Sequence, residues 1–256
     1  MDNSQYQPII IAAGMSKRLA ELTANKPKSF LEIQNKRIID YHLDILNSNG
    51  FRQATIVVGY LREQFFQTIG SRHKNLAIDY VVSEEFASTG HAWSVYLTRT
   101  AWQREKRPVL LIHADVFYDP RLLEKMMVCP YDNVTLVDKA FKVLTGDECI
   151  VRGQNGLVSS LLFDSTTAPK IIIGEFVGIS KWSAPFLDGF YTHLEQFFTR
   201  AGRNVSYEVV LDEFIQKEKR LLYSLETNGL AWLNINYRED YERARDKLYS
   251  QIYKSS

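Results

Sequence analysis

The stretch PIIIAAGMSKRLAELTANKPKSFLEI, residues 8–33, decides the fold of this chain and the place of its site. It opens with an apolar run, residues 8–13, which predicts a fully buried strand because it is hydrophobic without alternation. Gly14 and a polar loop with two cations follow, and a second basic element surrounds Lys28. A buried strand that leads into a glycine-containing loop commonly places backbone N–H groups against phosphate. Cations at three places indicate a large anion, such as a triphosphate.

Length and composition bound the class of protein. The chain has 256 residues, of which 45% are hydrophobic and 24% charged, as expected for an ordinary globular protein. Its net charge of +1 argues against binding of nucleic acid or a membrane over the whole surface, so the anion site is local. Residues 1–7 are polar and the apolar run after them is too short for a signal peptide. We therefore expect a cytoplasmic protein with no nucleic-acid or membrane partner; a homodimer stays open.

For two cysteines and two histidines, the sequence favours a structural role over a catalytic one. Cys129 and Cys149 fit no disulfide framework and no metal-ligand spacing, so they predict small core residues in a reducing compartment. His91 and His113 are candidate acid/base groups, but the sequence pairs neither with a partner. For a lone histidine the structural interpretation is favoured.

The first half of the chain alternates strands with helices. The expected strands are 9–13, 54–58, 77–82, 108–112 and 133–138, and the expected helices are 38–47, 62–69, 92–102 and 120–127. This alternation predicts a parallel sheet with crossover helices.

The second half has a different character. Glycines at 153 and 156 suggest antiparallel strands within 148–162. Further strands are expected at 170–179, 220–226 and 232–236, and helices at 184–199, 207–217 and 238–253. We expect one domain over residues 1–256: an α/β, Rossmann-like fold with a mostly parallel, mixed central sheet and helices on both faces.

Ligands of an open α/β sheet bind beyond the carboxyl ends of its parallel strands. Three such ends carry polar residues: 14–18, 59–60 and Asp115, which follows an apolar run. A carboxylate there can hold Mg²⁺ together with substrate phosphates. The alternative for Asp115 is a turn or helix-capping residue, and for the loop cations a solvated surface. A metal and phosphate-binding cations belong in one site, which favours the functional interpretation.

Two motifs carry a resemblance to a known family. Residues 12–19, AAGMSKRL, and 26–31, KPKSFL, resemble the signature of the nucleoside-triphosphate transferases, which include the sugar-nucleotide pyrophosphorylases. Weaker matches follow in the same order along nearly the whole chain, at 37–65, 93–97, 114–115, 174–179 and 232–236. The chain is particularly similar to bacterial CTP:phosphocholine cytidylyltransferases and related small enzymes. The resemblance implies a glycosyltransferase-A-like fold, with an NTP-binding half over 1–140 and an acceptor-binding half over 141–256.

The reaction that the resemblance implies is nucleotidyl transfer. A phosphate oxygen of a small phosphorylated or phosphonate acceptor attacks the α-phosphorus of an NTP, with CTP favoured by overall likeness, and pyrophosphate leaves. Carried over by position, Arg18 would stabilise the leaving pyrophosphate and Lys28 would hold the transferring or acceptor phosphate. Asp115 and Asn236 would bind Mg²⁺. The implied nucleotide-binding residues are Ala12, Ala13, Gly14, Met15, Ser16, Lys17, Gly59 and Thr89, and the implied acceptor-binding residues are Trp93, Glu175 and Tyr207.

Two departures from the family pattern concern the nucleotide loop and the metal position. Ser16 stands where the family has glycine, and Asn236 stands where relatives have aspartate. Three functions therefore remain open: a cytidylyltransferase, a sugar-1-phosphate nucleotidylyltransferase using UTP, dTTP or GTP, and a catalytically silent nucleotide-binding subunit. The modest length and the lack of a repeat tail favour the first. Acidic residues 147, 148 and 175 would suit a primary amine or sugar hydroxyls on the acceptor.

Overall fold

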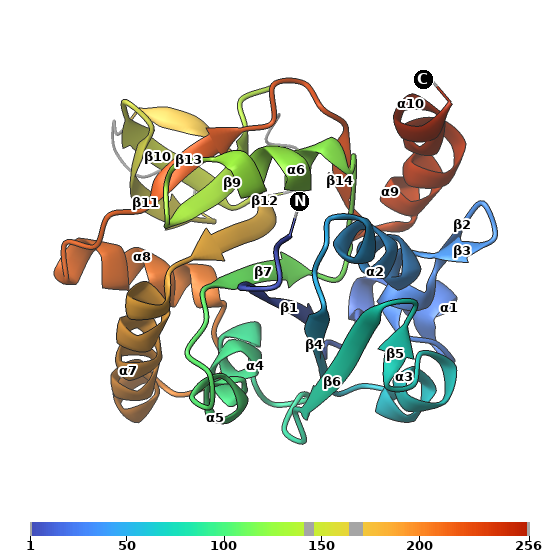
Figure 1. Ribbon diagram of the computed structural model, residues 1–256, viewed down its shortest axis with the longest axis horizontal. Coiled ribbons are helices and arrows are strands. Elements are labelled where there is room, and N and C mark those ends of the chain that lie inside the picture. Colours follow the sequence, from blue (N-terminus) through green and yellow to red (C-terminus); the bar gives the residue numbers. More distant parts are fainter. Residues whose placement is uncertain (1, 141–145, 164–170, 255–256) are drawn as a thin grey trace.

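A computed structural model describes residues 2–140, 146–163 and 171–254 (Figure 1). One large sheet organises it. Its strands are β1 (Gln7–Ala12), β4 (Gln53–Val58), β5 (Arg72–His73), β6 (Leu76–Val82), β7 (Val109–His113), β9 (Val134–Asp138), β10 (Ile150–Gln154), β11 (Leu157–Leu162), β12 (Ile172–Trp182) and β13 (Tyr223–Glu226). They lie in the order β10-β11-β13-β9-β12-β7-β1-β4-β6-β5.

The predicted mixed sheet is confirmed. At its centre β1 pairs in parallel with β4 and β7, and β4 pairs in parallel with β6. The antiparallel strand β12 lies between β7 and β9, so these two strands run in the same direction and end at the same edge. The carboxyl ends of β1, β7 and β9 therefore share one edge of the sheet.

Helices cover both faces of the sheet, as the sequence predicted (Figure 1). On one face, α4 (His91–Leu97), α5 (Arg99–Trp102), α7 (Ala184–Ala201) and α8 (Tyr207–Lys217) share a core with Ile9. On the other, α2 (Ile38–Ser48), α3 (Arg62–Thr68) and α6 (Arg121–Val128) share a core with Ile10. Neighbouring strand residues thus face opposite cores, which explains why β1 is apolar without alternation.

Two expected helices are interrupted. The expected helix 92–102 divides into α4 and α5 at Thr98, whose hydroxyl donates to the Val95 carbonyl oxygen at 2.6 Å. The C-terminal helix consists of α9 (Arg238–Arg243), a π-helical turn (Ala244–Leu248) and α10 (Tyr249–Tyr253). Within the described ranges, no helix has the length and apolar character needed to cross a membrane.

A second, two-stranded sheet was not predicted. In it β8 (Val116–Tyr118) pairs antiparallel with β14 (Trp232–Asn234). Beside this pair, the Ile235 N–H donates to the Asp115 carbonyl oxygen at 3.0 Å. The C-terminal segment is therefore attached to the end of β7, where polar residues were expected. The segment between β1 and α2 contains the short helix α1 (Ala20–Thr23). It also contains a hairpin of β2 (Glu32–Ile33) and β3 (Lys36–Arg37).

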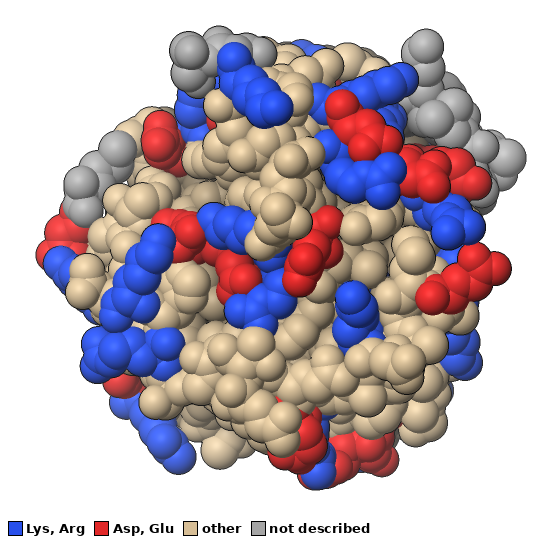
Figure 2. Space-filling view, turned by 90° about the vertical axis from the view of Figure 1, so that its right-hand side faces the viewer, with Lys and Arg blue, Asp and Glu red and all other residues tan. Residues whose placement is uncertain are grey.

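The surface charges fit the composition, and one of the two cysteines lies in the core as predicted. Figure 2 shows Lys and Arg interspersed with Asp and Glu over one face of the molecule. Cys149 is buried, as predicted, whereas Cys129 is partly exposed; both are free thiols.

Candidate functional site

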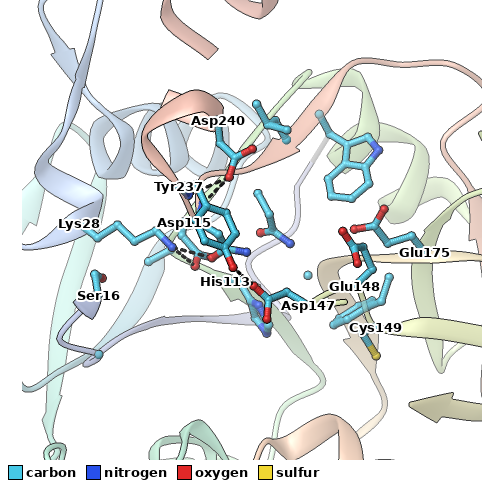
Figure 3. Close-up of a pocket in the computed structure, with 18 of the residues that line it drawn as sticks. Ser16, Lys28, His113, Asp115, Asp147, Glu148, Cys149, Glu175, Tyr237 and Asp240 are labelled. Atoms are coloured by element: carbon cyan, nitrogen blue, oxygen red, sulfur yellow. Dashed lines mark hydrogen bonds and ion pairs between the residues drawn. The ribbon is translucent and has the colours of Figure 1, made fainter. Parts of the chain in front are cut away.

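A cavity of about 800 Å³ opens at the shared edge where β1 and β7 end. The loop after β1, the end of β7, strand β12 and the C-terminal segment all contribute to its wall (Figure 3). Of the residues that the sequence predicted for the site, the cavity wall includes Ala12, Gly14, Ser16, Arg18, Lys28, Asp115, Glu175 and Asn236. Residues more than 200 positions apart therefore converge on one space.

Several predicted nucleotide-binding residues lie outside the described lining of the cavity: Ala13, Met15, Lys17, Gly59 and Thr89. Gly59 has a packing role, because a Cβ there would lie 2.7 Å from Phe86 Cβ and 2.8 Å from the Ala13 carbonyl oxygen. Ala13 is buried and accepts a hydrogen bond from the Tyr60 N–H at 3.1 Å. The Thr89 hydroxyl donates to the Glu85 carbonyl oxygen at 2.8 Å.

Two predicted acceptor-binding residues are also outside this lining. Trp93 stacks on Tyr96 with ring centroids 5.2 Å apart, and the Arg203 guanidinium lies 4.0 Å from the Trp93 ring centroid. Tyr207 is fully buried, and its hydroxyl lies 3.0 Å from His113 Nε2. Burial raises the pKa of Tyr207 well above its ordinary value and lowers the pKa of His113. Neither Trp93 nor Tyr207 is therefore proposed as a direct acceptor contact.

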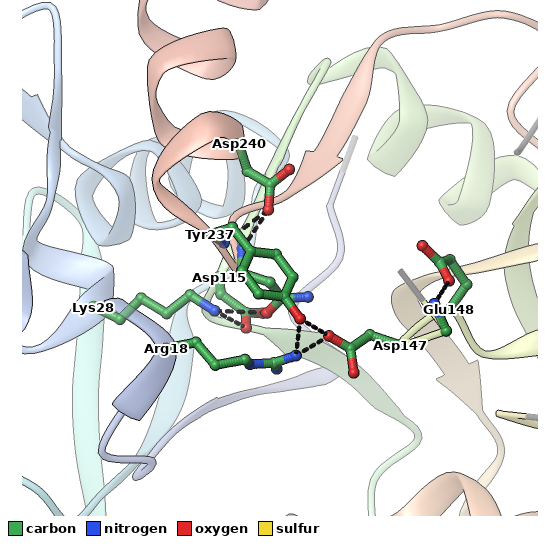
Figure 4. Close-up of polar contacts among 9 residues, drawn as sticks. Arg18, Lys28, Asp115, Asp147, Glu148, Tyr237 and Asp240 are labelled. Carbon is green, nitrogen blue, oxygen red and sulfur yellow. Dashed lines mark hydrogen bonds and ion pairs between the residues drawn. The ribbon is translucent and has the colours of Figure 1, made fainter. Parts of the chain in front are cut away.

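The centre of the site is an ammonium held between two oxygens (Figure 4). Lys28 Nζ donates to Asp115 Oδ2 at 2.8 Å and to Asn236 Oδ1 at 2.9 Å. The lysine side chain is only 12% exposed. Burial by itself would raise the pKa of Asp115, but the Lys28 ammonium and His113 outweigh it and lower that pKa to about 2. Asp115 is therefore an anion at neutral pH.

These oxygens fit a hard divalent cation. The Lys28 ammonium already shows that the Asp115 and Asn236 oxygens surround a position suited to positive charge. A further oxygen, Asn234 Oδ1, is buried in the cavity wall and accepts no hydrogen bond from the residues that the structure describes. Carboxylate and amide oxygens are the ligands that Mg²⁺ takes, together with substrate phosphates.

Arg18 belongs to a second polar group (Figure 4). Its guanidinium forms an ion pair with Asp147 and donates to the Tyr237 hydroxyl at 3.3 Å. That hydroxyl in turn donates to Asp147 Oδ2 at 2.5 Å. The Arg18 side chain is 48% exposed, so it can move to a ligand at little desolvation cost. Sequence reasoning missed Tyr237, although it follows Asn236 directly.

The Asp240 carboxylate fixes the backbone of the C-terminal segment. Its Oδ2 accepts from the Asn236 N–H at 2.9 Å and from the Tyr237 N–H at 2.8 Å. This is the helix-capping arrangement that satisfies free N–H groups at the start of α9. It holds the Asn236 and Tyr237 side chains at the cavity.

Carboxylates form another part of the wall, away from Lys28 (Figure 3). They are Asp138, Glu148 and Glu175. Burial, followed by the charges of Glu148 and Asp138, raises the pKa of Glu175 from its ordinary value near 4.5 to about 7. Asp138 was missed, yet it ends a buried strand at the same edge as Asp115, where the topological rule would have placed it. This acidic wall favours a ligand with positive charge.

Comparison with known proteins finds similarity to one enzyme family. Residues 7–130 match the model of the nucleotidyl transferase family. The chain is 24% identical to choline-phosphate cytidylyltransferase of Streptococcus pneumoniae, over 95% of this chain and 98% of that protein. It is 24% identical to CTP:phosphoglutamine cytidylyltransferase of Campylobacter jejuni, over 91% and 97%. It is 23% identical to CMP-5'-(3-aminopropyl)phosphonate synthase of Streptomyces rubellomurinus, over 95% of this chain but only 39% of that protein.

Solved structures show the same fold. CTP:phosphocholine cytidylyltransferase from Streptococcus pneumoniae superposes with a TM-score of 0.70 at 21% identity, covering 94% of this chain and 98% of that one. The inositol-1-phosphate CTP transferase from T. maritima has a TM-score of 0.77 at 18% identity, covering 98% and 99%. Sugar-1-phosphate uridylyl- and guanylyltransferases match the sequence as well. The predicted resemblance and fold are confirmed.

Proposed function

Because the chain is a nucleotidyltransferase with cytidylyltransferase relatives, we propose that it transfers CMP from CTP to a small phosphorylated or phosphonate acceptor, with release of pyrophosphate. We further propose that the acceptor carries a cationic group. The observation that supports this most is a single cavity whose wall combines the Lys28–Asp115–Asn236 group with the acidic residues around Glu175.

The proposed roles follow from charge and position. Asp115 and Asn236 would hold Mg²⁺, which neutralises charge on the triphosphate when it is bound. Lys28 would leave the Asp115 carboxylate and donate to the phosphate that is transferred. Arg18 would leave Asp147 and bind the departing pyrophosphate. The reaction needs no covalent enzyme intermediate, so these residues act by positioning and by stabilising charge. The backbone of residues 12–16 would lie along the nucleotide.

The acidic wall supports a cationic acceptor. Asp138, Glu148 and Glu175 line the cavity, and burial, followed by repulsion from Glu148 and Asp138, raises the pKa of Glu175. A bound ammonium or quaternary ammonium group would relieve this repulsion. Three relatives are named for choline phosphate, phosphoglutamine and aminopropylphosphonate, which are small acceptors with a phosphate or phosphonate group.

A matched pair of acceptors tests this proposal. With CTP and Mg²⁺, 3-aminopropylphosphonate should be used with a kcat/KM at least about tenfold higher than butylphosphonate, because the methyl group replaces the ammonium without changing the length. The readout is the rate of pyrophosphate release at several acceptor concentrations. Equal values for the two phosphonates would remove the cationic group from the proposal. Preference for glucose 1-phosphate over both would favour a sugar-1-phosphate enzyme.

The ionisation of Glu175 predicts a pH-dependent stability. Its pKa is raised from near 4.5 to about 7 in the folded protein, so the native state binds a proton that the unfolded chain has lost. The free energy of unfolding should therefore fall as the pH rises from about 4.5 to 7, through this group. Glu175→Gln should remove this part of the slope. Urea unfolding of both proteins at several pH values measures it, and parallel stability curves would contradict the assignment.

A further inference from the structure

A histidine–carboxylate cluster lies in the cavity wall apart from the Lys28 group. It consists of His91, His113 and Glu208, all of which line the cavity. His91 Nε2 is 3.5 Å from Glu208 Oε2, and His113 Nε2 is 3.4 Å from Glu208 Oε1. One ligand atom from each residue lies within 4.8 Å of the others. None of these side chains has a role in the proposed transfer reaction or is a proposed ligand of Mg²⁺.

The fold brings the three residues together through a close backbone contact. Gly90 donates its N–H to the Arg203 carbonyl oxygen at 2.9 Å, and the Ala92 N–H donates to the Val205 carbonyl oxygen at 3.2 Å. A Cβ at Gly90 would lie 2.1 Å from that Val205 oxygen, so only glycine permits the approach. The contact sets the start of α4, with His91, against the start of α8, with Glu208.

The carboxylate is buried without the hydrogen bonds that it needs. Glu208 is 2% exposed, and no group in the described ranges donates a hydrogen bond to its Oε2. The two N···O separations, 3.4 and 3.5 Å, exceed those of charge-assisted hydrogen bonds, which are about 2.7–2.9 Å. Taken singly, each N···O pair is close to the roughly 3.3 Å between two ligands that each lie about 2.05 Å from a tetrahedral metal ion, and the two histidines face different oxygens of the carboxylate.

We propose that His91, His113 and Glu208 bind one divalent transition-metal ion such as Zn²⁺. One coordination position of this ion would be open to the cavity. Two imidazoles and one carboxylate suit Zn²⁺ or Co²⁺, whereas Mg²⁺ prefers oxygen ligands alone. Three protein ligands leave the remaining position for water or for an anionic oxygen of a ligand in the cavity.

Metal binding at His113 Nε2 would replace the contact of this atom with the Tyr207 hydroxyl, which lies 3.0 Å away. The other ring nitrogen of His91, Nδ1, lies 3.5 Å from the Tyr207 N–H, at the outer limit of a hydrogen bond. A neutral hydrogen bond contributes far less free energy than the ligand bonds of a structural zinc ion. Replacing the hydrogen bond of His113 by a metal–ligand bond is therefore favourable.

Direct metal binding tests the proposal without nucleotide or acceptor, so it does not depend on the proposed reaction. The full chain is stripped with a chelator and titrated with Co²⁺, whose visible absorption reports its ligands; a competition with Zn²⁺ follows. The wild type should bind one equivalent. Glu208→Gln and His91→Gln should each weaken binding at least about tenfold, as expected when one of three ligands is lost. His73→Gln is the matched control, because His73 pairs with Asp44 at 2.7 Å and is not among the cavity-lining residues described.

Two further variants and the wild type itself distinguish this metal site from the proposed Mg²⁺ position and from no site. Asp115→Asn should retain Co²⁺ binding, which would separate this ion from the proposed Mg²⁺ position. His91 has a 36% exposed side chain, so His91→Gln should fold, and circular dichroism confirms this before titration. No uptake by the wild type, or equal uptake by the wild type and His91→Gln, would overturn the proposal.

Discussion

Replacing Asp115 by asparagine should lower kcat for nucleotidyl transfer on the order of a thousandfold, because it removes the one carboxylate of the proposed Mg²⁺ position. The substitution keeps the size of the side chain, and the amide oxygen can still accept from Lys28. Initial rates of pyrophosphate release at saturating Mg²⁺ and CTP measure the effect.

The matched control is Asp79→Asn. Asp79 is exposed and accepts a hydrogen bond from Gln53 at 2.8 Å, on the strand β6. This variant should keep the wild-type rate. If kcat of Asp115→Asn is within about threefold of the wild-type value, Asp115 is not a metal ligand and has only a structural role in the turn after β7.

Replacing Lys28 by methionine should change two quantities in opposite directions. Transfer should slow about a hundredfold or more, because one charged donor to the transferring phosphate is lost. Binding of a divalent metal without nucleotide should tighten about tenfold, because the ammonium no longer occupies the Asp115 and Asn236 oxygens. Mn²⁺ titration followed by electron paramagnetic resonance measures the affinity of the free protein.

Lys26→Met is the control for this experiment. Lys26 lies in the same loop and is exposed, so its loss should change neither quantity. Weaker metal binding in Lys28→Met than in Lys26→Met would mean that the ammonium supports the metal position instead of filling it. A wild-type transfer rate would place Lys28 outside the reaction.

Local patterns were enough to predict most of the fold. Buried strands and amphipathic helices have periods that a sequence displays directly, and α8 was predicted with its observed bounds, Tyr207–Lys217. The strand β8 was missed because it has only three residues and its pairing with β14 spans more than 100 positions. A sequence carries no register for such a distant pair.

In the site, too, residues marked by local patterns could be predicted, and contacts between distant segments could not. Asp115 could be predicted because it follows a parallel strand, and the ends of parallel strands meet at one edge of a sheet. Lys28 could be predicted from the basic loop and its likeness to the family motif. Tyr237 and Glu208 could not be given partners, since these depend on how the C-terminal segment and α8 pack against distant strand ends. Trp93, which the resemblance implied at the acceptor site, packs with Tyr96 and Arg203 and is not among the described cavity-lining residues.

Pyrophosphate release with a panel of nucleotides tests the central proposal most directly. CTP, UTP, GTP, ATP and dTTP are each combined with Mg²⁺ and, in turn, with phosphocholine, 3-aminopropylphosphonate and glucose 1-phosphate. We predict rapid release with CTP and a cationic acceptor, and none when Mg²⁺ is chelated. No release with any pair, from a folded protein that binds CTP, would contradict the proposal and indicate a silent nucleotide-binding subunit.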